Sequence, residues 1–122
     1  MPVLIKLTVY DIPPSNNKFI GNSHNFNVYR REKEKWHYLI KAAIGRAKKP
    51  QKPLERAIVH ITYYFKDARR RDPDNYSGKM LLDPLVREGI LADDNFGVVE
   101  LRLSGRVQKE NPRTEIEITE RN

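Results

Sequence analysis

The chain contains no cysteine among its 122 residues. This absence excludes a disulfide framework and any metal site built from thiolates. The chain also lacks a long hydrophobic run, because Lys6 and Asp11 interrupt the apolar stretch of residues 3–12. That stretch has no small-residue cleavage site and is shorter than a membrane span, so we expect neither a signal peptide nor a membrane partner. The expected location is the cytoplasm.

The chain has fewer acidic than basic residues: 16 Asp and Glu against 23 Lys and Arg, which gives a formal net charge of +7. The sequence pI is about 9.7. A basic balance of this size is typical of proteins that bind nucleic acid, although charge alone does not establish such a partner. A chain of 122 residues can bury a modest core, so we assign residues 1–122 to a single domain.

Two familiar ion-binding motifs are missing as well. Gly78 and Lys79 do not belong to a phosphate loop, because the earlier glycine and the following Ser or Thr are absent. A calcium loop counted from Asp72 has Tyr76 and Ser77 at its fifth and sixth positions, where an acidic ligand and a glycine are needed. A phosphate loop and an EF-hand are therefore excluded.

The densest group of charges lies in residues 69–79. Three arginines run into two aspartates that are one residue apart: Arg69, Arg70, Arg71, Asp72 and Asp74. The residue before a proline is pushed toward extended geometry, so we expect Asp72 to be extended and to share one side of the chain with Asp74. Two carboxylates in one place suit Mg²⁺, and arginines beside them suit a phosphate. The stretch favours phosphodiester chemistry.

A second interpretation of the same stretch stays open on the local sequence. Asp-Pro-Asp-Asn is common in turns and at helix starts, with Asp74 or Asn75 as the N-cap. Three arginines in a row are also common on solvated surfaces. The local pattern does not decide between a site and a turn.

Periodicity along the chain predicts the order β-α-β-α-β-β. Strands are predicted over residues 3–9, 56–65, 98–107 and 114–119, the last two as a hairpin. One helix is predicted from about Tyr29, with Asn27 as a candidate cap and Pro50 beyond its end. A second follows Asp74, and Pro84 predicts either a kink or two short helices that meet at Asp83.

The expected fold class is α/β with α+β character: one small domain in which two helices pack on a mixed four-stranded sheet. The first strand leads into a shaped Pro-Pro loop. Three polar residues of that loop are candidates for contact with a phosphate backbone: Asn16, Asn17 and Lys18. An ordinary polar connection is the alternative. A further acidic pair, Asp93 and Asp94, precedes the third strand.

Three segments together resemble the RusA-type Holliday junction resolvases over nearly the whole chain. Pro13-Pro14-Ser15-Asn16-Asn17 is similar to that family's N-terminal loop, Arg70-Arg71-Asp72-Pro73-Asp74-Asn75 to its central acidic motif, and Leu91-Ala92-Asp93-Asp94 to its second one. The final strand, residues 114–119, also matches. Each segment alone is a weak signal, whereas the combination is specific.

The resemblance implies a homodimeric, Mg²⁺-dependent endonuclease that resolves four-way DNA junctions by paired nicks in recombination and repair. It assigns the catalytic, metal-binding carboxylates to Asp72, Asp74 and Asp94. The family usually has a functional lysine four residues after the second aspartate, but here Gly78 holds that position and Lys79 follows. A bulge at Ser77-Gly78 could restore the direction of the side chain, so Lys79 remains the candidate.

Two other classes of function compete with a nuclease. A non-catalytic DNA-binding module needs the basic surface but not three carboxylates, which repel the DNA backbone without metal. A metal-stabilised structural domain would bury its aspartates and unfold on chelation. EDTA distinguishes the three, because a nuclease loses cutting but keeps its fold.

Overall fold

The computed structural model describes residues 5–19, 24–45, 47 and 49–121. The elements in chain order are β1 (Ile5–Val9), η1 (Asn16–Phe19), α1 (His24–Ile44), β2 (Ala57–Phe65), η2 (Pro73–Asn75), α2 (Lys79–Arg87), β3 (Val99–Val107) and β4 (Arg113–Glu120). The two η elements are short 3-10 helices. The predicted order β-α-β-α-β-β is confirmed, and the start of the first predicted strand lies outside the described residues.

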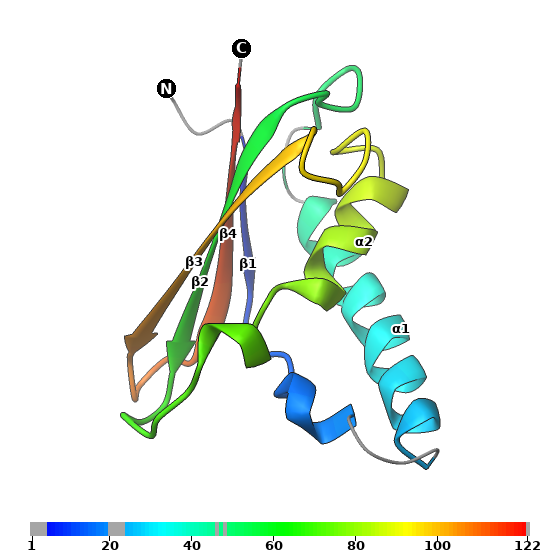
Figure 1. The fold of residues 1–122 in the computed structure, drawn as a ribbon. Coiled ribbons are helices and arrows are strands. Elements are labelled where there is room, and N and C mark those ends of the chain that lie inside the picture. Colours follow the sequence, from blue (N-terminus) through cyan, green and yellow to red (C-terminus); the bar gives the residue numbers. More distant parts are fainter. Residues whose placement is uncertain (1–4, 20–23, 46, 48, 122) are drawn as a thin grey trace.

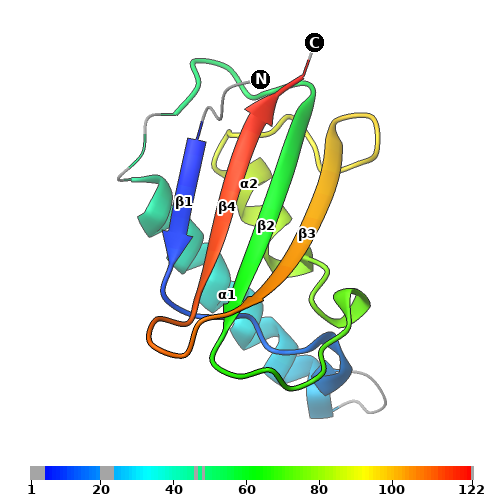
Figure 2. The same cartoon turned by 90° about the vertical axis from the view of Figure 1, so that its left-hand side faces the viewer.

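The four strands form one mixed sheet in the order β1-β4-β2-β3. β2 is parallel to β3 and antiparallel to β4, and β4 is antiparallel to β1. The predicted hairpin of the last two strands is wrong, because β2 lies between them (Figure 2). The apolar, largely buried β2 gains a neighbour on each side, whereas the largely exposed β3 takes an edge.

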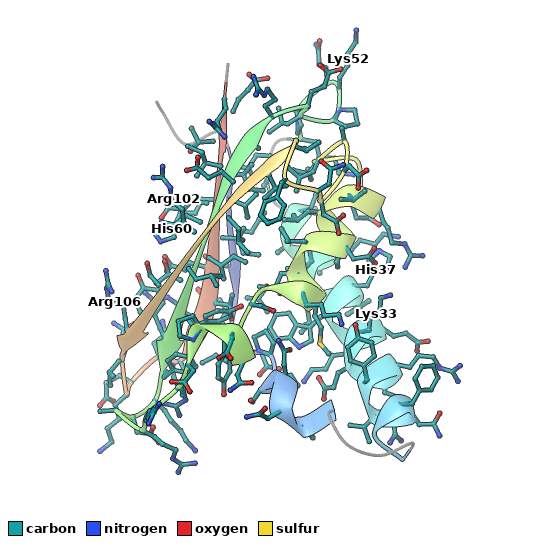
Figure 3. All side chains as sticks on the ribbon, viewed as in Figure 1. Lys33, His37, Lys52, His60, Arg102 and Arg106 are labelled. Carbon is teal, nitrogen blue, oxygen red and sulfur yellow. The ribbon has the colours of Figure 1, made fainter. Side chains whose placement is uncertain are left out.

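Both helices cover the same face of the sheet (Figure 1). The core lies between these layers, and its members alternate along the strands and recur at helical spacing along α1: Ile5, Leu7, Trp36, Ile40, Ile44, Val59, Ile61, Leu81, Leu85, Ile116 and Ile118. The opposite face of the sheet is polar, and His60, Arg102 and Arg106 project from it away from the helices (Figure 3). This confirms the predicted mixed sheet with two helices packed on it.

The first helix begins at His24, earlier than the predicted start near Tyr29. Asn27 therefore lies inside the helix, and the prediction that it caps the start is wrong. The first turns extend beyond the sheet, where Phe26 is exposed. The apolar period that identifies a helix in sequence begins only where α1 reaches the core. The polar composition of residues 21–27 predicts a segment outside the helix, but residues 24–27 form the first turn of α1, and residues 21–23 lie outside the described residues.

The second helix runs without a break from Lys79 to Arg87 and contains Pro84. The alternative of two short helices that meet at Asp83 is therefore wrong. Pro84 cannot donate a backbone hydrogen bond to the carbonyl of Met80. Pro84 and Leu85 are both buried in the core, and their packing offsets the lost hydrogen bond. Among the described residues, no helix has the length and apolar character needed to cross a membrane.

Gly78 starts α2 in a left-handed conformation, with φ of 80°. A Cβ at this position would lie 2.6 Å from Cδ1 of Ile61. Gly89 has a similar φ of 79° but no atom within 4 Å of its Cβ position. We expect Gly89→Ala to cost about 1–2 kcal/mol of unfolding free energy from the backbone alone and Gly78→Ala to cost more. Urea unfolding measures both, and equal losses would contradict the predicted clash.

Candidate nuclease site

The central charged stretch lies at the carboxyl end of β2, as expected for a site on an open sheet. Residues 66–71 form a loop after Phe65, and η2 follows directly (Figure 1). Asp72 has φ of −104° and ψ of 139°. The prediction that the following proline holds Asp72 in extended geometry is confirmed.

Pro73–Asn75 form one turn of 3-10 helix, so the extended geometry stops at Asp72. The argument from strand alternation for placing Asp72 and Asp74 on one side therefore fails. Asp72 occupies the N-cap position of this turn, yet its side chain makes no capping hydrogen bond. The Asp74 side chain is exposed. Turn formation thus uses neither carboxylate as a cap, and the oxygens are donors of the kind that Mg²⁺ prefers.

The three arginines have different surroundings. Arg70 donates from Nε to Asp72 Oδ1 at 3.3 Å, and its side chain is 89% exposed. Arg69 is also exposed. The Arg71 side chain is only 16% exposed, with its guanidinium 2.9 Å from Asp67 Oδ1 and 4.3 Å from the centre of the Phe65 ring. Arg69 and Arg70 are available to a phosphate, whereas Arg71 holds the loop.

Asp67 anchors this loop from its other end. Its carboxylate accepts a hydrogen bond from the backbone N–H of Arg69 at 3.1 Å and pairs with Arg71. These two contacts, the Arg69 N–H first, hold the pKa of Asp67 below its ordinary value. The anchor is therefore fully present above the ordinary aspartate pKa and is lost as the pH falls through the lowered value.

The N-terminal loop lies against the acidic segment. The side-chain nitrogen of Asn16 donates to the carbonyl oxygen of Asp74 at 3.2 Å and to the hydroxyl of Ser77 at 3.0 Å. Asn17 and Lys18 are exposed beside it. Asn16 thus fixes the backbone that carries Asp74, and Asn17 and Lys18 face the solvent as a phosphate contact requires.

Lys79 begins α2, and its Nζ lies 5.3 Å from the centre of the Tyr29 ring. The backbone is not helical at Ser77 and Gly78, so the spacing from Asp74 to Lys79 does not follow a helical period. A small pocket is lined by Asn16, Asn75 and Lys79 together. The predicted lysine therefore belongs to the same surface as the acidic turn.

An aromatic pocket opens beside Asp72. Tyr63, Phe65 and Tyr76 form its wall, with ring centroids 5.2 to 5.9 Å apart. The remaining lining residues are Arg71, Asp72, Pro73, Leu103, Ser104 and Gly105. The sequence does not reveal this pocket, because it forms only where the turn after β2 folds over the end of β3.

Asp93 and Asp94 lie at the other end of the sheet. They precede β3, which is parallel to β2 in a register that pairs Ala57 with Val99 and Phe65 with Val107. Nine residues of strand separate the two ends, a length of about 26 Å. Among the described residues, no three acidic or histidine side chains lie close enough to hold a metal ion. Asp72 and Asp74 therefore lie in one turn, whereas Asp94 of the same chain lies at the opposite end of the sheet.

The two members of the second acidic pair differ in their hydrogen bonds. Asp93 accepts from the backbone N–H of Asp94 at 2.7 Å and from the side chain of Asn95 at 3.2 Å. Asp94 is exposed, and its carboxylate has no hydrogen bond among the residues that the structure describes. Asp93 stabilises the turn, which leaves the Asp94 carboxylate available.

Comparison with protein families supports the resemblance found in the sequence. A family model described as endodeoxyribonuclease RusA matches residues 11–119 of this chain. The chain belongs to the RusA family. No curated protein matches it. The matched segment of this RusA-family chain contains the Asn16 loop, the acidic turn at Asp72 and the Asp93–Asp94 pair, so the family indicates an endodeoxyribonuclease whose candidate residues come from three separate loops.

Proposed function

We propose that this protein is a Mg²⁺-dependent endonuclease that resolves four-way DNA junctions by paired nicks, as a cytoplasmic homodimer in recombination and repair. The observation that carries the proposal is the acidic turn of a RusA-family chain, whose carboxylates are not used as caps and lie beside exposed arginines. A four-way junction is nearly two-fold symmetric, so two matched nicks suit an isologous dimer.

The separation of the carboxylates gives a specific reason for the dimer. Asp94 lies near the start of β3, whereas Asp72 and Asp74 follow the end of β2. Two protomers that run antiparallel bring the start of β3 in one beside the end of β2 in the other. We place Asp94 of one protomer with Asp72 and Asp74 of its partner, so each of the two metal sites takes ligands from both chains.

The donor set fits Mg²⁺, which binds through a few carboxylates and retains waters. A bound Mg²⁺ supplies a water of lowered pKa and positive charge for the scissile phosphate. Asp72, Asp74 and Asp94 would hold that ion. Arg69 and Arg70 orient the DNA backbone, and Lys79 offsets the charge that develops on the phosphate or the leaving oxygen. Asn16 holds the Asp74 segment in position for this chemistry.

A cleavage assay with a four-way junction, a flap and a plain duplex tests the proposal. We expect Mg²⁺-dependent cutting of the junction in preference to the other two substrates. EDTA should stop cutting and leave the circular dichroism spectrum unchanged. Junction binding without cutting would indicate a DNA-binding module, and unfolding in EDTA would indicate a structural metal domain.

Asp94→Asn should abolish cutting and raise the Mg²⁺ concentration that any residual activity needs. Asp93→Asn is the matched control at the neighbouring position. It loses one of the two hydrogen bonds that the Asp93 carboxylate accepts in the turn, which should reduce activity by about 10–100-fold at most. A Mg²⁺ titration of both variants measures the difference. An inactive Asp93→Asn beside an active Asp94→Asn would reverse the two roles.

The exposed arginines should govern the salt dependence of junction binding. Arg69→Ala and Arg70→Ala should each lower the slope of log affinity against log salt by about one unit, because each removes one phosphate contact. Arg71→Ala should mainly lower thermal stability, since its guanidinium packs on Phe65 and pairs with Asp67. Unchanged slopes for Arg69→Ala and Arg70→Ala would show that neither side chain contacts a phosphate and that both are only solvent-exposed surface residues.

A further inference from the structure

The outer edge of β3 is free to pair with another strand. β3 is the last strand in the sheet order. The carbonyl of Val98 accepts from Ala57, and the N–H of Gln108 donates to Phe65, so even-numbered residues turn their backbone groups toward β2. The odd-numbered residues of β3 therefore present their N–H and C=O groups outward. A nine-residue edge of this kind is a template for pairing.

The helix-side surface of β3 is apolar and only partly covered, since Val99 is buried and Leu103 packs partly against the core. Leu101 is 36% exposed and Val107 is 57% exposed. At the opposite edge of the sheet, the corresponding residues of β1 are buried: Ile5, Leu7 and Val9. Gly105 has no side chain, and its place borders the aromatic pocket beside Phe65. The two edges thus differ, and β3 is the one that leaves apolar side chains, Leu101 and Val107, exposed on the helix side.

The sequence of β3 is complementary to itself in the antiparallel direction. When Leu103 faces Leu103 of a second copy, Glu100 lies opposite Arg106, Leu101 opposite Gly105, and Val99 opposite Val107. The two nearest alternative registers have Arg102 or Ser104 on the two-fold axis. They place Arg102 opposite Arg102 or opposite Arg106 of the second copy, which opposes like charges. Arg106 has no ion pair among the described residues, and its NH1 bonds the carbonyl of Gly105. Figure 3 places Arg106 on the face away from the helices.

We infer that two copies of this protein pair through β3, antiparallel and with Leu103 on the two-fold axis. In this arrangement Leu101 of the partner packs in the space above Gly105, against the aromatic pocket. Arg106 of one protomer pairs with Glu100 of the other. Within each chain, Glu100 already pairs with Arg102 at 2.7 Å and with Arg121 at 3.3 Å. This surface rests on the proposed function, and it brings the Asp94 loop of one protomer to the end of the sheet where the other carries Asp72.

The natural absence of cysteine makes a crosslinking test direct. Residues that face each other across a hydrogen-bonded antiparallel pair have Cα atoms about 5.5 Å apart. Leu103→Cys should therefore form a covalent dimer with a short bifunctional thiol crosslinker. Val107→Cys is the control, because its exposed thiol would lie about 27 Å from its counterpart in this register. Failure of Leu103→Cys to crosslink, or equal crosslinking of both variants, would overturn the inference.

Sedimentation of a variant with a charge introduced into the interface is a second test. The wild-type chain should sediment at close to twice 14.3 kDa, and Leu101→Lys should sediment as a folded monomer. Tyr38→Lys is the matched control, since Tyr38 is an exposed apolar residue on α1 and should leave the dimer intact. A dimer that survives Leu101→Lys would refute the β3 surface while junction cutting stands. If the wild type fails to cut junctions while the Leu103→Cys variant crosslinks as expected, the function is refuted and the surface stands.

Discussion

Asp74→Asn and Asp72→Asn should each abolish junction cutting and leave junction binding intact. The substitution keeps the size of the side chain and removes one negative charge from the proposed metal site. Loss of one preorganised electrostatic group commonly costs about 10²–10³-fold in rate, and loss of a metal ligand should cost at least that much. Binding should persist or strengthen, because less negative charge then faces the phosphate backbone.

Single-turnover cutting and gel-shift affinity, both measured over a Mg²⁺ titration, separate these effects. Asp83→Asn is a suitable control, because Asp83 lies on α2 and pairs at 3.9 Å with Arg87, away from the acidic turn. It should cut like the wild type. Normal cutting by Asp74→Asn in Mg²⁺ would exclude the acidic turn as the metal site.

Mixing two inactive variants should restore cutting if each metal site takes ligands from both chains. A heterodimer of Asp72→Asn and Asp94→Asn protomers carries both defects in one site and leaves the other site intact. The purified heterodimer should therefore nick one strand of each junction, because it has one intact metal site where the wild-type dimer has two. If each site came from a single chain, every site in the mixture would be damaged and no activity would return.

The matched control is a heterodimer of Asp72→Asn and Asp74→Asn. These residues belong to the same acidic turn, so each site of this heterodimer has one damaged ligand, and it should stay inactive. Differently tagged protomers, unfolded and refolded together, give the heterodimers for nicking assays on a labelled junction. Recovery in the control, or no recovery with the Asp94 variant, would contradict a site shared between chains.

The candidate residues of the proposed site could be chosen from the sequence, because the choice depends on local chemistry. Pro73 restricts the residue before it, and Asp72 is extended as that restriction requires. The identities of the charged residues at 69–74 and 93–94 could also be recognised without a fold, and the family match covers all of them. The contacts of Arg71 and Asn16 could not be predicted from the sequence, since their partners depend on how the loops fold against each other. Asn16 reaches Asp74 across 58 positions of the chain.

Strand and helix periods alone determined the type and order of the helices and long strands and the side that each one buries, because each element has one apolar side to remove from water. Periodicity carries no information about which strands become neighbours. Only the tertiary structure decided that β2 separates β3 from β4 and that β3 is a free edge. The same topology sets Asp72 and Asp94 at opposite ends of parallel strands, since a crossover through α2 returns the chain to the start of the sheet before β3 begins.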